Sequence, residues 1–326
     1  MNPPAPAWLA ASLPLAPSDV GPALRSALAA GALQLPLPGG GSTLTRWLAL
    51  AELSALDLGL GRLAEAHTDA LAVLAELSGP PGDGLWGVWA AEPPTARVEA
   101  DVRGGRWTLE GTKAWCSGAL LLDRALVTAH AADGRRLFAV DVHDVQPVHG
   151  TWAAVGMASS GSVSVTMAGV PAEPVGGPGA YLRRPGFWHG GAGVAACWYG
   201  GMLGAGRLLL AVARARDADP HLLAHLGAVD ALVAGTAAHL AAAAAEVDAD
   251  PDGPGAQQRA GRLRVRVEAA ATEVLDRVGR ALGAGPLCLD PVHAQRAADL
   301  PVYLRQSHAE RDLQGLGELA VAEAAW

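Results

Sequence analysis

A tryptophan, a cysteine and a serine stand side by side at Trp115, Cys116 and Ser117, inside an otherwise apolar strand pattern. Residues two positions apart on a strand lie on the same face, so the indole of Trp115 and the hydroxyl of Ser117 are expected next to each other. An apolar ring beside a hydroxyl and a backbone N–H suits a flat ligand with polar atoms along its edge. The alternative is that Trp115 belongs to the core and Ser117 to a turn that ends the strand.

Two charged residues accompany this stretch. Lys113 precedes Trp115 by two positions, and Glu92 stands earlier in the chain, in the loop Ala90–Pro93. Lysine is rarely buried without a partner. We therefore expect Lys113 to be a structural charge at the surface rather than a catalytic group.

Three zones of different character must position these residues. Residues 1–80 are rich in alanine and leucine, and their apolar residues recur at helical spacing. Residues 81–185 hold short runs of β-branched and aromatic residues, with turn signals at Gly104-Gly105 and Asp133-Gly134. Residues 186–326 are helical again. The sequence therefore predicts an α+β chain with an N-terminal helical domain, a middle antiparallel β domain and a C-terminal four-helix bundle.

Glycine and proline indicate where the helices of the outer zones end. In the first zone, a helix pair or one interrupted helix is expected at 47–77, broken at Gly59 and Gly61. In the last zone, segments rich in proline and glycine separate the four bundle helices. These helices are expected near 188–217, 220–247, 255–283 and 296–324.

The bulk composition excludes several classes of protein. With a net charge of −8, the chain is not expected to bind nucleic acid through the phosphate backbone. The longest uncharged apolar run, 190–206, is glycine-rich and short for a bilayer span, so we expect a buried helix and no membrane association. The three cysteines are far apart and the N-terminus does not resemble a signal peptide, so the expected compartment is the cytoplasm.

Three segments carry a resemblance to a known family. They are GLWGVWAAEPP at 84–94, RWTLEGTKAWCSGALLLDRALVTA at 106–129, and the serine-rich run at 156–173. Through them the chain resembles the acyl-CoA dehydrogenase family, as a divergent and shortened member. The most specific match is a G-x-K-x-W-x-[ST] pattern after an E-P loop, formed by Gly111, Lys113, Trp115 and Ser117.

The resemblance implies a flavin cofactor, FAD, bound between the β domain and the bundle. In the family, residues that match Trp115, Cys116 and Ser117 line the isoalloxazine ring, and the loop that matches Ala91 and Glu92 runs along it. Many members have threonine where this chain has Ala91, so one hydroxyl toward the flavin is lost. Trp115 is then expected to be the apolar wall and Ser117 the hydrogen-bond donor at the flavin edge.

Two family signatures are missing. The catalytic glutamate of the main branch falls on Ser307, next to His308, so His308 is expected as the substitute base and Ser307 as its neighbour in the site. In the alternative, Ser307, His308 and Glu310 only cap a helix turn. The arginine signature that reaches the FAD pyrophosphate is also absent, and by charge alone Arg214 or Arg216 is the candidate replacement.

The resemblance favours one function and leaves two alternatives. The leading expectation is an acyl-CoA dehydrogenase-type enzyme, which removes an α proton from an acyl thioester, transfers a hydride to flavin and passes electrons to an acceptor flavoprotein. The alternatives are a flavin-dependent monooxygenase on the same fold and a non-catalytic member that serves as a subunit or binding protein. A homodimer or homotetramer through the bundle is expected in line with the family.

Overall fold

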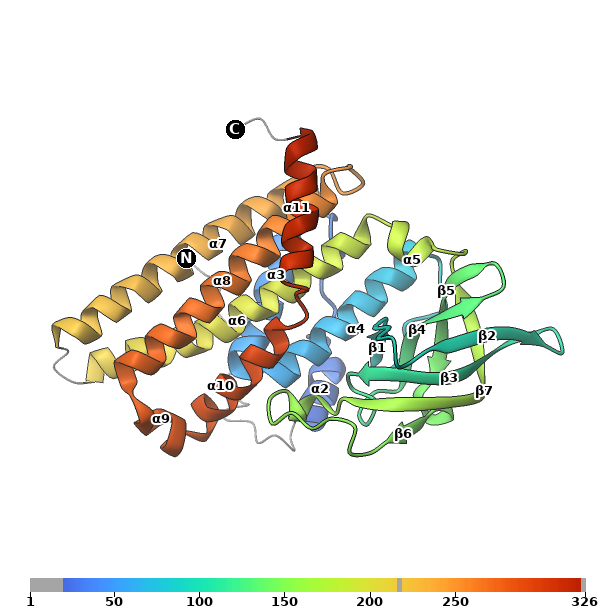
Figure 1. Ribbon diagram of the computed structural model, residues 1–326, viewed down its shortest axis with the longest axis horizontal. Helices are drawn as coiled ribbons and strands as arrows, with labels where there is room; N and C mark the ends of the chain where they lie inside the picture. The colour runs from blue at the N-terminus through green and yellow to red at the C-terminus, as the bar shows by residue number, and fades with distance from the viewer. Residues whose placement is uncertain (1–19, 216–218, 324–326) are drawn as a thin grey trace.

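The computed structural model describes residues 20–215 and 219–323, and it is an α+β protein in which all strands lie between two helical regions (Figure 1). The first strand begins at Trp86 and the last ends at Val175. This order of helices, strands and helices agrees with the expected order. The proposed domain limits of 1–80, 81–185 and 186–326 remain a prediction.

The N-terminal helices are α2 (Val20–Ala29), α3 (Thr43–Leu56) and α4 (Leu58–Glu76). The break between α3 and α4 falls at Asp57 rather than at Gly59 or Gly61, because the Asp57 carboxylate accepts the Leu60 N–H at 2.8 Å and caps α4. The two glycines lie inside α4 and serve packing instead. A Cβ at Gly61 would stand 1.9 Å from the Ser54 hydroxyl oxygen, so only glycine permits this approach of α3 and α4.

The strands form a barrel. Strand β4 pairs with β5, β5 with β7, β7 with β3, β3 with β2, and β2 with β4, so the ring closes. Hairpins join β2 to β3 and β4 to β5 at the two predicted turns. The expected antiparallel domain needs one correction, because the β1–β4 and β2–β4 pairs are parallel. The strands are β1 (Trp86–Trp89), β2 (Val98–Arg103), β3 (Arg106–Cys116), β4 (Arg124–Ala131), β5 (Gly134–Asp141), β6 (Gln146–Val148) and β7 (Val163–Val175), with short 3-10 turns η2 (Val142–Asp144) and η3 (Ala158–Ser160).

Helix α4 lies between the barrel and the C-terminal helices (Figure 1). It packs against β1 and η3 on one side and against α6 on the other. His67 of α4 is buried, and its Nδ1 accepts the Trp86 N–H at 3.2 Å. Burial lowers the pKa of His67 to about 4, so the ring stays neutral and joins α4 to β1 as a packing residue.

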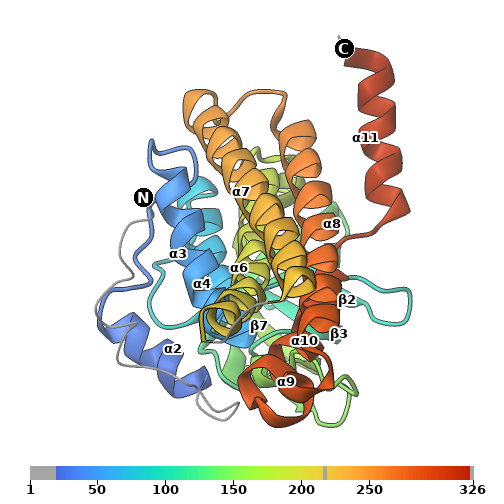
Figure 2. The ribbon, with the colours of Figure 1, turned by 90° about the vertical axis from the view of Figure 1, so that its left-hand side faces the viewer.

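The C-terminal region differs from the expected bundle in its fourth helix. That helix is divided by the turn at 305–309, in which Ala309 has a positive φ of 49°. Its first half begins at Pro291, before the expected position 296, because the Asp290 side chain caps it through the Val292 and His293 N–H groups. The helices are α5 (Ala180–Arg183), α6 (Gly186–Ala215), α7 (Pro220–Ala249), α8 (Ala256–Leu282), α9 (Ala284–Leu289), α10 (Pro291–Leu304) and α11 (Glu310–Glu323). Helix α11 lies at the outside of these helices and contacts α8 (Figures 1 and 2).

By length and composition alone, α6 and α7 are apolar enough to cross a membrane, which is weak evidence for a membrane protein. Helix α6 is mostly buried, as expected for the apolar run at 190–206, because α3, α4, α8 and α10 pack around it. Helix α7 is mostly exposed.

Candidate functional site

The site is built at the end of β3, where Trp115 adopts a left-handed backbone with φ of 57°. This conformation is costly for a bulky residue. It coincides with an irregularity in the pairing of β3 with β7, between Lys113 and Cys116. As a result the indole turns outward and is 57% exposed. The expectation of a regular strand face is therefore wrong in detail, since β3 ends at Cys116 and Ser117 begins the following turn.

Cys116 points the other way. Its side chain is fully buried, and burial raises the pKa of the thiol to about 12. A thiol with this pKa stays protonated at neutral pH, so Cys116 is not a nucleophile here. The expected place of Cys116 along a flavin remains a prediction.

The hydroxyl of Ser117 belongs to a group of three serines. Ser162 Oγ donates to Ser117 Oγ at 3.3 Å, and Ser160 Oγ lies 2.7 Å from Ser162 Oγ. Ser162 has one hydroxyl hydrogen for these two contacts, so the hydroxyl of Ser117 is held only by the longer one. The Ser117 carbonyl accepts the Trp89 indole N–H at 3.0 Å, which ties this turn to β1.

The loop that carries these serines is held by α10. Ser160 Oγ donates to the Met157 carbonyl at 2.6 Å, and the Met157 N–H donates to Asp299 Oδ1. Gln295 donates to the same oxygen at 2.7 Å. Burial raises the pKa of Asp299 to about 6. In the same loop, the buried Ser159 hydroxyl has no hydrogen-bond partner.

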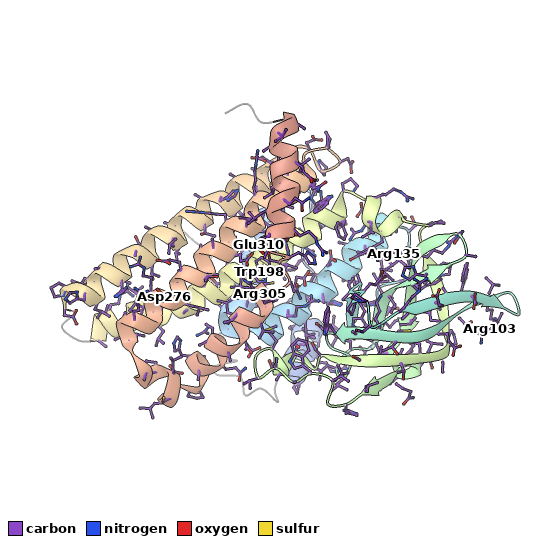
Figure 3. All side chains as sticks on the ribbon, in the orientation of Figure 1. Arg103, Arg135, Trp198, Asp276, Arg305 and Glu310 are labelled. Carbon is purple, nitrogen blue, oxygen red and sulfur yellow. The ribbon has the colours of Figure 1, made fainter. Side chains whose placement is uncertain are left out.

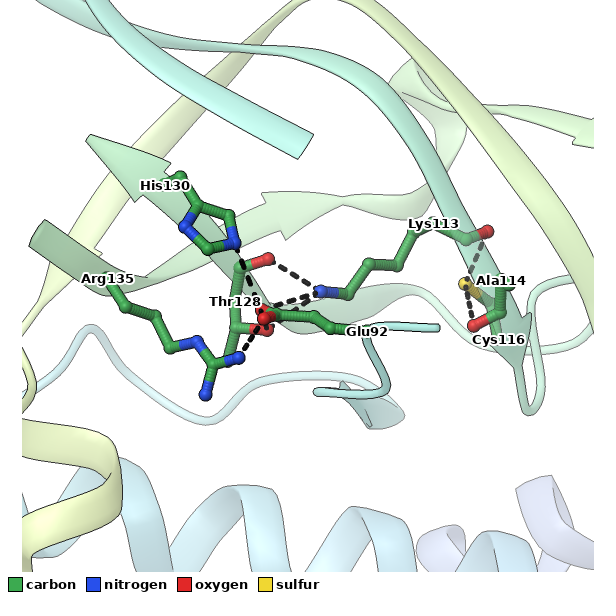
Figure 4. Close-up of polar contacts among 7 residues, drawn as sticks. All are labelled: Glu92, Lys113, Ala114, Cys116, Thr128, His130 and Arg135. Atoms are coloured by element: carbon green, nitrogen blue, oxygen red, sulfur yellow. Dashed lines mark hydrogen bonds and ion pairs between the residues drawn. The ribbon is translucent and has the colours of Figure 1, made fainter. Parts of the chain in front are cut away.

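Glu92 does not point its side chain toward Trp115 or Ser117. Its carboxylate lies among residues of the barrel strands (Figure 4). Thr128 Oγ1 donates to Glu92 Oε1 at 2.7 Å, Lys113 Nζ and His130 Nε2 lie 3.4 Å from its two oxygens, and Arg135 forms a close ion pair with it. Ala91, which precedes Glu92, is half-buried, and its place along a flavin remains a prediction.

Lys113 overturns the expectation of a surface charge. Its side chain is only 1% exposed, and its amine donates to the carbonyl and the hydroxyl of Thr128, both at 2.7 Å. Burial lowers the pKa of Lys113 to about 8. The bond to Thr128 and the Glu92 carboxylate explain why the barrel accepts an ammonium group in its interior.

Ser307 and His308 lie in the turn between α10 and α11. Ser307 is buried and its Oγ accepts the Ala309 N–H at 3.1 Å, while His308 is 65% exposed and its Nδ1 lies 3.2 Å from Asp312 Oδ1. These contacts favour the helix-cap alternative for Ser307. Figure 3 labels Arg305 and Glu310, which stand on either side of this turn, at the end of α10 and the start of α11.

The structure does not bring His308 into contact with Trp115 or Ser117 within the described chain. Its role as a base remains a prediction. Arg214 lies exposed in the last turn of α6, and its role toward a pyrophosphate is likewise untested. The alternative Arg216 lies outside the described residues.

The sequence reading missed the roles of Ser160, Ser162 and Thr128. The signal for the serines was present in the run SSGSVS, because three hydroxyls before a strand seldom serve packing alone. For Thr128 no local signal exists, because its partners come from other strands.

A hollow of about 410 Å³ lies elsewhere in the described chain. It is bounded by the loop at 34–37 and by residues of α3 and α4, and neither Trp115 nor Ser117 lines it. Because the indole of Trp115 is exposed, it forms an open surface on this single chain. A ligand bound on this surface would need other residues to cover its far side.

No family model matches the chain, and no curated protein sequence matches it. Solved structures do. Methanesulfinate monooxygenase MsuC from Pseudomonas fluorescens is 19% identical, covers 98% of this chain and 96% of its own, and has a TM-score of 0.81. KijD3, in complex with FMN and a dTDP-amino-keto-sugar, is 16% identical, covers 99% and 96%, and also has a TM-score of 0.81.

A third similar structure is TdsC from Paenibacillus sp. A11-2, in complex with FMN and indole. It is 20% identical, covers 92% of this chain and 94% of its own, and has a TM-score of 0.77. TdsC is described as a dibenzothiophene monooxygenase. At these identities the likeness establishes the fold, so the chain has the acyl-CoA dehydrogenase-like fold.

Proposed function

We propose that this protein is a flavin-dependent monooxygenase that oxidises a small organic molecule. The observation that carries the proposal is the exposed Trp115 indole at the end of β3, with the half-buried Ser117 two residues further along the chain. The fold neighbours add support, because MsuC and TdsC are described as monooxygenases. Their descriptions favour this alternative over acyl-CoA dehydrogenation.

The residues present fit a flavin. Trp115 would provide the apolar surface for the flat ring, and the Ser117 hydroxyl would donate to a polar atom at the ring edge. When bound and reduced, a flavin supplies the electrons that let one oxygen atom of O₂ enter the substrate and the other leave as water. Trp115 would bind the flavin ring and Ser117 would orient it, while Ser162 of the loop at 157–162 contacts Ser117.

We propose FMN rather than FAD as the flavin. TdsC and KijD3 are described with FMN, and this chain lacks the arginine signature that the family uses for the FAD pyrophosphate. A monooxygenase of this kind needs reduced flavin, so the expected protein partner is a flavin reductase instead of an acceptor of electrons. The ligands described for the neighbours, indole and a dTDP-sugar, favour a small-molecule substrate over an acyl-CoA.

His308 is proposed as the proton acceptor, acting together with Asp312. If the neutral ring donates its Nδ1 hydrogen to Asp312, the Nε2 atom is left as an acceptor with a fixed direction. The observation in favour is the 3.2 Å contact between His308 Nδ1 and Asp312 Oδ1. For this role the turn at 305–309 must approach the substrate.

The deciding experiment begins with flavin binding. Purified protein is titrated with FMN and with FAD, and the spectrum of the oxidised ring near ~450 nm is followed. We expect FMN to bind more tightly. With FMN reduced by an added reductase, ¹⁸O₂ and either indole or methanesulfinate, we expect one labelled oxygen in the product.

Two outcomes would contradict the proposal. Anaerobic bleaching of the bound flavin by an acyl-CoA would restore the dehydrogenase reading. Failure to bind either flavin would favour the non-catalytic reading, in which the fold has lost its cofactor.

A further inference from the structure

Glu92 is the centre of a charged network that joins several strands (Figure 4). Its carboxylate is 14% exposed and contacts side chains from β3, β4 and β5, while its own backbone follows β1. The partners are Lys113 from β3, Thr128 and His130 from β4, and Arg135 from β5.

This network contacts both segments that hold the proposed flavin wall, which is the surface formed by Trp115 and Ser117. Lys113 stands two residues before Trp115, so fixing its amine fixes the strand from which the indole projects. On the other side, Glu92 follows Trp89, whose indole N–H holds the Ser117 carbonyl at 3.0 Å. One carboxylate therefore links the start and the end of the wall through the barrel interior.

We infer that Glu92 is a positioning residue, which through Lys113 sets the orientation of the Trp115–Ser117 wall for the flavin. The inference rests on the proposed function and deepens it, since the sequence resemblance had placed Glu92 along the flavin itself. The side chain acts from behind the wall, because its oxygens are already used by the barrel residues.

The charge balance gives the reason for a strong effect. Lys113 and Arg135 bring two positive charges to the one negative charge of Glu92, and Lys113 is buried. Removing the carboxylate leaves an uncompensated buried cation, which is the costly way to break such a network. The Lys113 ammonium group would then move toward solvent or another acceptor, and the end of β3 at Trp115 would shift with it.

The test compares Glu92→Gln with Glu99→Gln. Glu99 lies on the same barrel in β2, but its ion pair with Arg97 is exposed, so the same change there is the matched control. Thr128→Val serves as a milder variant, because it keeps both charges and removes the hydroxyl that donates to Glu92 and accepts from Lys113. If Glu92→Gln does not fold, Thr128→Val carries the test.

Two quantities are measured. The first is the dissociation constant of FMN, which we expect to rise about tenfold or more in Glu92→Gln, less in Thr128→Val, and not in Glu99→Gln. The second is hydrogen exchange of the backbone at 113–118 in flavin-free protein, which we expect to become faster in Glu92→Gln. The paired part of the β2–β3 hairpin, residues 98–111, is expected to keep its exchange rate. Adding Lys113→Met to Glu92→Gln removes the stranded charge and is expected to restore part of both losses.

The inference is overturned if Glu92→Gln binds FMN like the parent, or if exchange rises throughout the barrel to the same degree, since that describes general loosening. If the parent binds no flavin, the proposed function fails on its own. Hydrogen exchange at 113–118 then decides the inference about Glu92. A local increase in the Glu92→Gln variant supports it, and an unchanged rate rejects it.

Discussion

At the level of single residues, Trp115 and Ser117 show how a local irregularity makes a binding surface. The left-handed backbone of Trp115 sends a large apolar ring into solvent, which the folded chain alone has no reason to do. Strain of this kind is expected where a ligand later covers the ring. The cost is borne because buried neighbours hold the backbone on both sides, Lys113 before it and Cys116 after it.

The first residue-level prediction concerns the Ser117 hydroxyl. In Ser117→Ala, the flavin edge loses one donor, and the dissociation constant of FMN is expected to rise about tenfold, or ~1–2 kcal/mol. The measurement is a fluorescence titration of FMN. Ser164→Ala, at a half-buried serine of β7 outside the Ser117, Ser160 and Ser162 group, is the control. Equal affinity for parent and Ser117→Ala would remove this hydroxyl from the site.

A second residue-level prediction concerns pH and Asp299. Its pKa is raised from 3.8 to about 6 in the folded state, so the folded protein holds this proton more tightly than the unfolded chain does. The contribution of Asp299 to stability is therefore fully present below pH ~4 and is lost as the pH rises through about 6.

Asp299→Asn tests this. Both hydrogen bonds go to Oδ1, and the amide oxygen of asparagine can accept both. We expect the unfolding free energy of the variant to be higher at pH 7–8 by roughly 2–3 kcal/mol at most, and to depend less on pH between 4 and 7. Denaturant unfolding at a series of pH values measures it. A steeper pH dependence in the variant than in the parent would contradict the assignment.

At the level of elements, glycines decide how closely helices approach. A Cβ at Gly200 of α6 would stand 2.1 Å from the Ala51 carbonyl oxygen of α3, and a backbone atom cannot move aside alone. At Gly227 of α7, nothing lies within 4 Å of such a Cβ. The same substitution is therefore expected to have opposite signs on the two helices.

Gly200→Ala should lower the unfolding free energy by about 1–3 kcal/mol or more, because α3 and α6 must separate. Gly227→Ala should raise it by roughly 0.5–1 kcal/mol, since alanine favours an exposed helix. Thermal or denaturant unfolding of both variants checks this. A stabilising Gly200→Ala would mean that α3 and α6 are not in close contact.

At the level of the whole molecule, the long exposed helix α7 favours assembly of several copies. The stretch 231–245 of α7 has no Asp, Glu, Lys or Arg, and it is largely small and apolar although α7 is mostly exposed. A smooth apolar helix of this kind is suited to pack against a second helix. The homodimer or homotetramer expected from the family remains a prediction, and residues 231–245 of α7 are the surface through which we expect the copies to pack.

Ala238→Glu tests this surface. The side chain at Ala238 is exposed in the single chain, so a charge there is tolerated by the fold but not by an apolar interface. We expect the variant to sediment as a smaller species than the parent. Ala322→Glu, at an exposed position of α11, is the control. An unchanged mass for Ala238→Glu would place any assembly elsewhere.

Much of the architecture was predictable from local patterns. Apolar spacing and turn residues predicted the order of helices and strands and the two hairpins, because helix periodicity and turn chemistry act over a few residues. The division of the last helix at 305–309 was not predicted, and its start lies at Pro291, where Asp290-Pro291 is a helix start that the sequence displays. The break between α3 and α4 lies at Asp57 instead of Gly59 or Gly61, because a capping carboxylate starts a helix more decisively than a glycine ends one.

By itself, the sequence determined the elements, the motif at 111–117 and the positions of its indole and hydroxyl along the chain. Only the tertiary structure decided which way these groups face. It turned Trp115 outward, placed Ser162 behind Ser117 and drew Lys113 and Glu92 into the barrel. The physical reason is that burial and charge pairing depend on partners from distant strands, and closure of the barrel brings those partners together.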